Sequence, residues 1–332
     1  MSRQVAWASG THGTYLRTID GGVTWTPAQV PDAGTLDFRA VVAFSADEAF
    51  LMSAGPGEQS RIYHTDDAGK HWQLQYGNTN PKGFFDSMVF WDAKHGVVLG
   101  DPITDEAGKF TFEVLLTDDG QNWRVVPSAQ LPAAMEGEGA FAASNTCIAI
   151  VPGGLDSNIW FATGGKVARV FHSADRGQSW QVVDAPMVHG PESAGIFSIA
   201  FRDAMHGVIA GGDYKHPNDD GPNLAFTEDG GKTWNLSTLH PLAYFSAVAY
   251  DRKVNEQAIR EAQIEKQMRV KAVAPQRMFI VGQDFVFDFR PPGNPRRING
   301  KKKIGIQFNA VSAYPEGGAL IVGPKGAMAF LP

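Results

Sequence analysis

One turn motif is written five times along this chain. Each copy sets an aspartate, a glycine and a tryptophan at fixed spacing, S/T-x-D-x-G-x-x-W, and the third copy has Leu116 at its first position. The copies are TIDGGVTW (18–25), TDDAGKHW (65–72), LTDDGQNW (116–123), SADRGQSW (173–180) and TEDGGKTW (227–234). The tryptophans recur every 47 to 57 residues, as expected when each repeat is one four-stranded sheet. Because such sheets bury a core only by packing side by side, the spacing predicts a β-propeller.

The fixed positions of this turn have structural tasks. The aspartate can accept hydrogen bonds from backbone N–H groups, the glycine can adopt positive φ, and the tryptophan covers the hairpin with a large apolar face. We therefore expect these residues to brace turns and to carry no chemistry. They are Asp20, Gly22, Trp25, Asp67, Gly69, Trp72, Asp118, Gly120, Trp123, Asp175, Gly177, Trp180, Asp229, Gly231 and Trp234.

The motif resembles the Asp box, or BNR repeat, found in sialidases, xyloglucanases, sortilin-type receptors and the photosystem II stability/assembly factors. The resemblance covers residues 1 to about 250. The compact run of near-identical turns is most similar to the assembly-factor family and its bacterial relatives outside photosynthesis. It implies an all-β fold, a seven-bladed β-propeller of four-stranded antiparallel blades. An Asp box is a folding device, so the motif says far more about fold than about function.

Composition agrees with a single β-propeller domain over residues 1–332. The chain has 43% hydrophobic residues, 37 glycines and 20 prolines, which suit a large core with many short turns. No window approaches the roughly 18 apolar residues of a membrane span, and the net charge of −6 argues against a general nucleic-acid binder. Cys147 is the single cysteine and is expected to be a buried, inert thiol. No histidine spacing or glycine-rich phosphate loop proposes a metal or cofactor, so we expect neither.

The apolar runs between turns read as strands A to D of successive blades. Seven B strands can be counted but only six inner A strands, at 36–44, 83–91, 139–150, 194–201, 243–250 and 306–314. The chain starts at a B strand and stops after a C strand, so a seven-bladed ring would lack one inner and one outer strand. In the relatives an N-terminal segment supplies both. Met1 is therefore expected to be an internal or truncated start, which would favour a periplasmic or secreted location.

The sixth repeat departs from the pattern. Residues 251–271 are rich in Glu, Gln, Lys and Arg and contain neither glycine nor proline. This composition predicts a short helical insertion. The stretch 290–303 carries six positive charges where another Asp box would lie. We interpret it as solvated charge, with contact to an anionic partner as the second interpretation.

Topology indicates where a ligand site should lie. In a four-stranded antiparallel blade the Asp-box turns share one face with the A-to-B loops, so we expect the site on the opposite face. Each inner strand contains a phenylalanine that serves as an anchor for aligning the strands. These anchors are Phe38, Phe85, Phe141, Phe197, Phe245 and Phe308. The residues that follow these anchors should form a largely polar ring at the channel mouth. They are Arg39, Asp86, Ala142, Ser198, Ser246 and Asn309.

Further acidic residues are expected at the same rim. Asp101 and Asp213 end B strands, Glu138 precedes the inner strand of the fourth blade, and Tyr214 follows Asp213. Two carboxylates that converge in a channel could serve glycoside hydrolysis as acid and base. Asp86, Asp101, Glu138 and Asp213 are thus the catalytic candidates. They could instead brace turns or pair with cations such as Arg39.

The interpretation we favour is a non-enzymatic binding or complex-assembly module, a monomer with a protein or peptide partner. The alternative is a glycoside hydrolase of sialidase or xyloglucanase type, with carbohydrate as its ligand. A sialidase should show an arginine triad and an Arg-Ile-Pro start, and neither is recognisable here. Xyloglucanases usually need two such propellers in tandem, and this chain has one.

Overall fold

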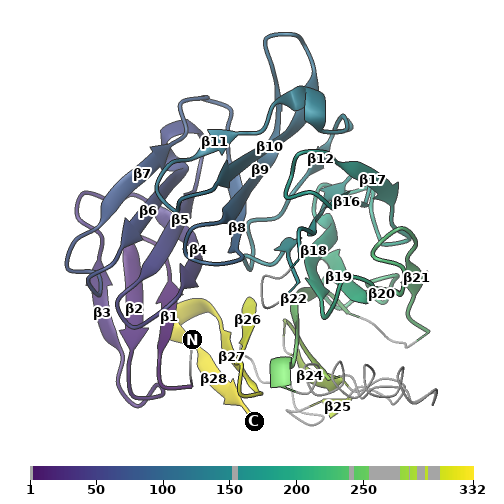
Figure 1. Cartoon of the computed structure of the whole chain (residues 1–332). Coiled ribbons are helices and arrows are strands. Elements are labelled where there is room, and N and C mark those ends of the chain that lie inside the picture. Colours follow the sequence, from purple (N-terminus) through teal and green to yellow (C-terminus); the bar gives the residue numbers. More distant parts are fainter. Residues whose placement is uncertain are drawn as a thin grey trace, which may run out of the picture.

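The computed structural model describes residues 3–151, 156–238, 243–253, 277–283, 285–289, 296–297 and 307–332. Seven antiparallel sheets stand around a central axis (Figure 1). The expected seven-bladed β-propeller is thereby confirmed. The expected helical insertion at 251–271 falls almost wholly outside the described residues, as does most of the basic stretch 290–303. Within the described ranges, no helix is long and apolar enough to span a bilayer.

Four blades are complete four-stranded sheets that run from the inner to the outer strand in chain order, and three of them, blades 2, 3 and 6, have strands that are consecutive in the chain. Blade 2 consists of β4 (Asp37–Ala43), β5 (Ala49–Ala54), β6 (Arg61–Thr65) and β7 (Gln73–Gly77). Blade 3 consists of β8 (Phe85–Phe90), β9 (Gly96–Thr104), β10 (Phe110–Thr117) and β11 (Arg124–Val125). Blade 6 consists of β22 (Phe245–Tyr250), β23 (Met278–Gly282), β24 (Phe285–Phe289) and β25 (Arg296–Arg297). Short 3-10 turns lie at η1 (Gly57–Gln59), η2 (Ser128–Gln130) and η3 (Pro324–Gly326).

The fourth repeat contributes strands to two sheets, those of blades 4 and 5. Blade 4 consists of β13 (Ile148–Ala149), β14 (Ile159–Ala162), β16 (Arg169–Ser173) and β17 (Gln181–Asp184). Blade 5 consists of β18 (Ala194–Phe201), β19 (Gly207–Asp213), β20 (Leu224–Thr227) and β21 (Asn235–Leu236). Two short strands from the fourth repeat, β12 (Glu138–Gly139) and β15 (Gly164–Gly165), extend the sheet of blade 5 at its inner edge.

The first and last blades have three strands each within the described residues. Blade 1 consists of β1 (Ala6–Ser9), β2 (Thr14–Thr18) and β3 (Thr26–Gln29). Blade 7 consists of β26 (Ala310–Ala313), β27 (Ala319–Val322) and β28 (Met328–Leu331). Among the residues that the structure describes, blade 1 has no inner strand and blade 7 has no outer strand. The two ends of the chain meet at these blades (Figure 1), where the Arg3 Nη2 donates to the Gly317 carbonyl at 2.7 Å.

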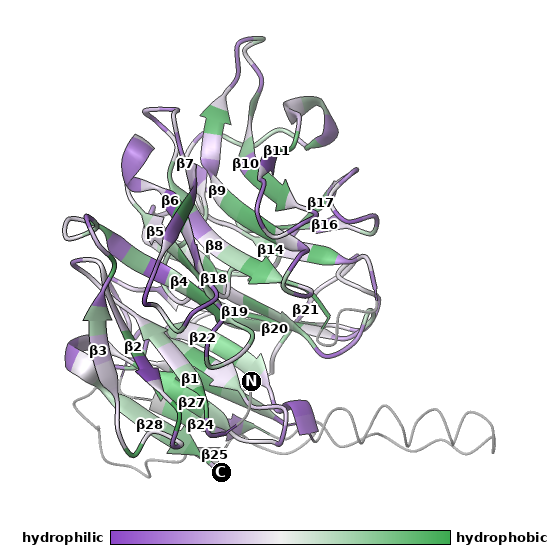
Figure 2. Ribbon diagram, turned by 60° about the vertical axis from the view of Figure 1, so that its left-hand side comes forward, coloured by the Kyte–Doolittle hydropathy of each residue, from purple (hydrophilic) through white to green (hydrophobic). Residues whose placement is uncertain are grey.

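The hydrophobic core lies between neighbouring blades. Hydrophobic colouring follows the strands and hydrophilic colouring the loops (Figure 2). The cluster between blades 3 and 4 holds 14 buried residues, with Phe161 stacked on Phe171. The cluster that joins blades 7 and 1 contains only Ala6, Tyr314 and Leu320 among the described buried residues. Apolar packing is therefore weakest at the seam where the ring closes.

The Asp-box turns lie on the face of the ring that also carries the A-to-B loops. In the first box, Thr18 Oγ1 donates to Asp20 Oδ1 at 2.8 Å, and the Thr24 N–H donates to the same oxygen at 2.9 Å. The residue after the aspartate has positive φ, and in blade 2 this residue, Ala68, donates its N–H to the Asp47 carbonyl of the A-to-B loop at 2.9 Å. Box turns and A-to-B loops thus lie on one face.

The third box differs from the expected register. Its bracing carboxylate is Asp119, which accepts hydrogen bonds from Thr117 Oγ1 at 3.2 Å and from the Asn122 N–H at 2.7 Å. Asp118 is an exposed partner of Arg124 at 3.3 Å. The assignment of Asp118 as the structural residue was therefore wrong. This box is one residue shorter between its hydroxyl and its tryptophan, so Thr117 takes the place that the alignment gave to Leu116.

The inner strand expected at 139–150 is also interrupted. Only Ile148–Ala149 pairs as an inner strand, and residues 140–147 form turns. Asn145 has φ of 59°, and its Oδ1 accepts the N–H of Met88 at 2.7 Å. A side-chain amide thus binds a backbone group of the next inner strand, β8, where strand packing was expected.

Candidate functional site

Three of the six residues expected in the polar ring lie at β-bulges of the inner strands. The register skips one residue at Arg39 in β4, at Asp86 in β8 and at Ser246 in β22. In β18 the skipped residue is Phe197, so Ser198 lies one position beyond the place that the alignment gave it. Ala142 belongs to the turns of 140–147 and is not in a strand.

The two serines of this set are buried and link neighbouring inner strands. Ser198 Oγ accepts the Val248 N–H at 2.9 Å, and Ser246 Oγ donates to the Phe308 carbonyl at 2.8 Å. Both serines are 2% exposed or less. Their hydroxyls therefore bind backbone groups of the next blade and are not open to a ligand.

Asp86, Asp101 and Arg39 interact electrostatically in the channel. Asp86 is 1% exposed, and its Oδ2 has no hydrogen-bond partner among the described residues. Burial and then the negative charge of Asp101 hold the pKa of Asp86 well above its ordinary value, against a smaller lowering by Arg39. Burial also raises the pKa of Asp101, which accepts the Ala140 N–H at 3.0 Å. Asp86 and Asp101 are therefore the two candidate acids whose pKa is raised.

Arg39 reaches across the channel. Its Nε donates to Asp37 Oδ2 at 2.8 Å, and its Nη1 donates to the Ala142 carbonyl of the fourth repeat at 3.0 Å. The side chain is still 44% exposed. A guanidinium that is anchored at both ends but partly open can still donate hydrogen bonds to an incoming carbonyl group.

Glu138 is fully engaged within the protein. Its side chain is 0% exposed and forms an ion pair with Arg169, whose Nε lies 3.0 Å from Glu138 Oε1. Thr163 Oγ1 donates to the same oxygen at 2.6 Å, and the Met135 N–H donates to the second oxygen at 2.9 Å. The carboxylate thus holds the inner edge of blade 5 and offers no oxygen to a substrate.

Asp213 closes a turn. It accepts the Lys215 N–H at 2.9 Å and bonds His216 Nδ1 at 2.8 Å. Burial raises its pKa, but the hydrogen bonds from His216, Ser193 and Lys215 outweigh that effect and lower it to about 2. Tyr214 is half exposed and packs edge-on against Phe197. The turn therefore keeps Asp213 ionised down to acidic pH.

A cavity of about 410 Å³ lies beside two of these acids. It is lined by Asp101 and Glu138 together with Lys82, Phe141 and Glu192. Because Glu138 is already paired with Arg169, only Asp101 of the candidate acids is available to its contents. The arrangement does not supply the acid and base that glycoside hydrolysis requires.

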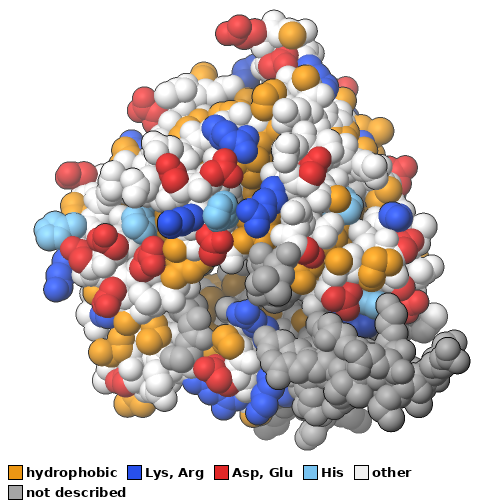
Figure 3. All heavy atoms as spheres, viewed as in Figure 1, with side chains coloured by type: hydrophobic (Ala, Val, Ile, Leu, Met, Phe, Trp, Pro, Cys, Tyr) orange, Lys and Arg blue, Asp and Glu red, His pale blue; other side chains and the backbone are white. Residues whose placement is uncertain are grey.

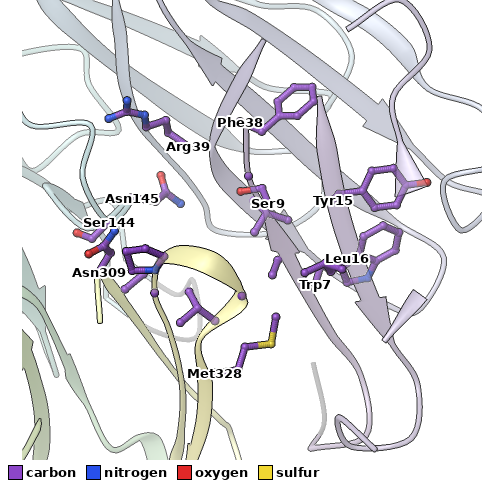
Figure 4. Close-up of a pocket in the computed structure, with 18 of the residues that line it drawn as sticks. Trp7, Ser9, Tyr15, Leu16, Phe38, Arg39, Ser144, Asn145, Asn309 and Met328 are labelled. Carbon is purple, nitrogen blue, oxygen red and sulfur yellow. The ribbon is translucent and has the colours of Figure 1, made fainter. Parts of the chain in front are cut away.

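The larger cavity, of about 860 Å³, lies between the first and last blades. Figure 4 shows Asn309 and Ser144 on one side, Trp7, Ser9 and Leu16 on the other, with Met328 below. Arg39 and Asn309 are the residues of the expected ring that line it. The face seen in Figure 3 mixes acidic and basic side chains around a hollow with hydrophobic side chains inside it.

Sequence reasoning did not single out most of this lining. Trp7, Ser9, Ser144, Asn145 and Met328 come from β1, the 140–147 turns and β28. No motif in the sequence marks these residues, which the fold brings together from segments far apart in the chain.

The described residues offer no metal centre. They contain no group of three or more His, Cys, Asp or Glu side chains able to hold an ion. Cys147 is buried, and burial raises the pKa of its thiol to about 12. A thiol of this kind is a poor nucleophile near neutral pH.

Comparison with known proteins places this architecture among Asp-box propellers. A family model described as "Photosynthesis system II assembly factor YCF48" matches residues 1–82. The chloroplastic photosystem II stability/assembly factor HCF136 of Oryza sativa subsp. japonica is 28% identical over 129 residues, and the Arabidopsis thaliana protein is 27% identical over 129. The alignments cover 38% of this chain but only 28% and 29% of those relatives.

Solved structures agree on the fold. A structure described as "YCF48 bound to D1 peptide" has a TM-score of 0.64 and 16% identity, covering 99% of this chain and 88% of that one. The GH74 xyloglucanase from Xanthomonas campestris has a TM-score of 0.62 and 13% identity, covering 98% of this chain and 50% of that one. At such identities the likeness concerns the fold alone. Fold and turn motifs together make this chain a seven-bladed β-propeller with Asp-box turns, and its sequence matches are to photosystem II assembly factors.

Proposed function

We propose that this propeller is a non-enzymatic module that binds a peptide segment of a partner protein during the assembly of a complex. The observation that carries the proposal is the cavity of about 860 Å³ at the inner edges of blades 1 and 7. Its volume is in the range of ligand-binding pockets. Its lining mixes apolar side chains such as Leu16 and Met328 with backbone groups and the amides of Asn145 and Asn309.

The charges of this cavity favour a neutral occupant. Besides His12, its charged lining residues are Asp37, Arg39 and Lys325. Asp37 and Arg39 pair with each other at 2.8 Å. Asn309 Oδ1 is buried with no hydrogen-bond partner among the described residues. Apolar surface combined with a spare amide oxygen suits an uncharged stretch of polypeptide.

The comparisons support the same class of function. The matching family and the curated relatives are named as photosystem II assembly factors, and one structural neighbour is described with a bound peptide. We take from them the kind of ligand, a protein segment, and leave its identity open.

The hydrolase alternative has weaker support. Of the four candidate acids, Glu138 is buried and ion-paired with Arg169. Asp213 has its pKa lowered to about 2 by hydrogen bonds within its own turn, so it cannot be the proton donor near neutral pH. Asp86 has a raised pKa but is 1% exposed. Asp101 alone cannot supply both the acid and the base or nucleophile.

The test is affinity capture from the source organism with three forms of the protein. Ser312 is exposed and lines the cavity, so Ser312→Trp should obstruct it and reduce capture of the partner at least tenfold. Leu74→Trp is the matched control, because Leu74 is 49% exposed on the outer strand β7. Equal capture by all three forms would place binding elsewhere.

A parallel assay with aryl glycosides and β-glucans addresses the alternative. We expect no turnover by the wild type. Turnover that is lost in Asp101→Asn would favour the hydrolase and overturn the proposal.

A further inference from the structure

The cavity of about 410 Å³ beside Asp101 lies apart from the seam where the ring closes. Its lining runs from Lys82 to Glu192 in the chain, and none of it belongs to blades 1 or 7. One wall is formed by the short strands β12 and β15, which place Gly139 opposite Gly164. A Cβ added to Gly139 would lie 3.0 Å from Asp101 Oδ1. Glycine at this position therefore lets the Asp101 carboxylate lie close against the wall.

Asp101 is the lining charge that the described part of the chain leaves uncompensated. Of the other charged lining residues, Glu138 is paired with Arg169, and Lys82 and Glu192 are exposed to solvent. Asp101 is partly buried and forms no ion pair with a described residue. Burial raises the pKa of its carboxyl group, as expected for an acid that is held away from water.

A second acid lies near Asp101. Asp86 is 1% exposed, and its Oδ2 has no hydrogen-bond partner among the described residues. The charge of Asp101 helps to raise the pKa of Asp86, whereas Arg39 lowers it by a smaller amount. The hydrogen bonds of Arg39 go to Asp37 and to the Ala142 carbonyl. A cation placed at Asp101 would therefore interact favourably with both carboxylates.

The rest of the lining is suited to an apolar stem. Phe110 and Phe141 are partly buried and line the cavity together with Pro102. The ring of Phe141 is fixed by stacking on Phe197, with the ring centroids 3.8 Å apart. Long basic side chains pack their methylene groups on such apolar surface and keep the charged end at a polar group.

The hydrogen bonding of Asp101 favours one kind of cation. Its Oδ1 accepts the Ala140 N–H at 3.0 Å, so Oδ2 is left for the contents of the cavity. A guanidinium grips both oxygens of a carboxylate side by side, whereas an ammonium group binds as a compact point charge. A primary ammonium group therefore fits this carboxylate better than a guanidinium does.

We propose that this cavity binds the side chain of a lysine in the partner segment. The ammonium group binds Asp101 Oδ2, and the methylene stem lies along Phe110 and Phe141. One uncompensated carboxylate matches one positive charge, whereas a free polyamine carries several, which the nearby Lys82 would repel. The inference rests on the proposed function for the source of the lysine, and it adds a contact site separate from the larger cavity.

The probe is the blocked peptide GGKGG, titrated into isotope-labelled protein. The NMR signals of the Gly137, Gly139, Gly164 and Gly165 amides report binding at this cavity. One matched peptide carries Nε-acetyllysine, which keeps the stem and removes the charge. The other carries arginine, which keeps the charge and changes its shape. We expect acetyllysine to bind at least tenfold more weakly than lysine, and arginine to bind more weakly as well. Equal binding of either peptide would overturn the proposal.

The matched protein variants are Asp101→Asn and Glu106→Gln. Asparagine removes the charge but keeps an oxygen that can accept the Ala140 N–H, whereas Glu106 is exposed and lies outside the lining. Asp101→Asn should bind GGKGG at least tenfold more weakly and Glu106→Gln should match the wild type, with melting curves as the check on folding. Equal weakening in both would show that the peptide senses only net charge, which overturns the proposal. If Asp101→Asn does not fold, the peptide series on the wild type still decides the question.

Two further measurements settle the source of the cation. Spermidine that binds more tightly than GGKGG would assign the cavity to a free polyamine and overturn the proposal. In partner capture, Asp101→Asn should retain at least tenfold less partner than the wild type. Capture that survives in Asp101→Asn but fails in Ser312→Trp would refute the lysine contact and leave the proposed function standing. Loss in Asp101→Asn alone would support the lysine contact and place the rest of the binding outside the larger cavity.

Discussion

The arc from blade 2 to blade 6 and the seam between blades 7 and 1 solve the same packing problem differently. In the arc, inner strands contact one another and clusters such as the 14 buried residues between blades 3 and 4 fill the interfaces. At the seam, Ala6, Tyr314 and Leu320 form the buried cluster among the described residues, and a cavity of about 860 Å³ lies beside it. Apolar packing should therefore stabilise the arc more than the seam.

Truncation of core side chains should expose this contrast most strongly. Phe161 is 0% exposed and contacts Phe112, Phe171 and Trp180, so Phe161→Ala should cost about 3–5 kcal/mol of unfolding free energy. Leu320→Ala at the seam should cost about 2 kcal/mol, the low end for leucine. Chemical denaturation measures both, and equal losses would contradict a weak seam.

The buried ion pair of the arc gives the next largest effect. Glu138→Gln leaves Arg169 buried without its counterion, which should cost about 3 kcal/mol. Glu138→Gln combined with Arg169→Met should regain most of that loss, because no buried charge remains. Urea titrations of the three forms test this, and purely additive losses would show that the pair is not coupled.

Replacing Asp86 should show that its buried carboxylate destabilises the folded protein. Its buried carboxylate has an oxygen without a partner among the described residues, so Asp86→Asn should stabilise the protein by about 1–3 kcal/mol at neutral pH. The pKa of Asp86 is raised in the folded state, so the folded protein binds this proton more tightly than the unfolded chain does. The free-energy penalty of burying the Asp86 carboxylate therefore falls as pH is lowered toward 3.8. Thermal melts at pH 7 and pH 5 should show a smaller gain at pH 5. A destabilised Asp86→Asn would contradict this account.

The smallest expected effect concerns the third Asp box. Asp119→Ala removes the acceptor of the Thr117 and Asn122 hydrogen bonds and should lower the melting temperature. Asp118→Ala should leave it unchanged, because Asp118 contacts only the exposed Arg124. The reverse ranking would restore the register expected from the sequence.

The box carboxylates also predict an acid limit. Hydrogen bonds from the Thr24 side chain lower the pKa of Asp20 to about 2, and the backbone N–H of His71 does the same for Asp67. Their folded-state pKa lies below the unfolded value near 3.8, so their contribution is present above pH 4 and lost as pH falls toward 2. Unfolding free energies measured across that window should drop more steeply in the wild type than in Asp20→Ala.

Blade number and the placement of the box turns could be predicted because they depend on local, repeated chemistry. The five tryptophans set the period, and that period predicted the seven blades. The third box could not be assigned, since Asp118 and Asp119 fit the pattern one residue apart, and the sequence does not show which one Thr117 binds.

The candidate site was less predictable because its determinants are distant in sequence. The bulge at Phe197 shifts Ser198 by one residue, and nothing local marks a bulge in an apolar run. The pairing of Glu138 with Arg169 crosses 31 residues, so an acid that looked open to a ligand is satisfied within the fold. The same applies to Asn145, which serves a strand 57 residues away.

The bond from Arg39 to the Ala142 carbonyl ties the inner strand of blade 2 to the turns of the fourth repeat. Arg39 also lines the large cavity. A movement of its guanidinium within the cavity must therefore shift or break its bond to the fourth repeat.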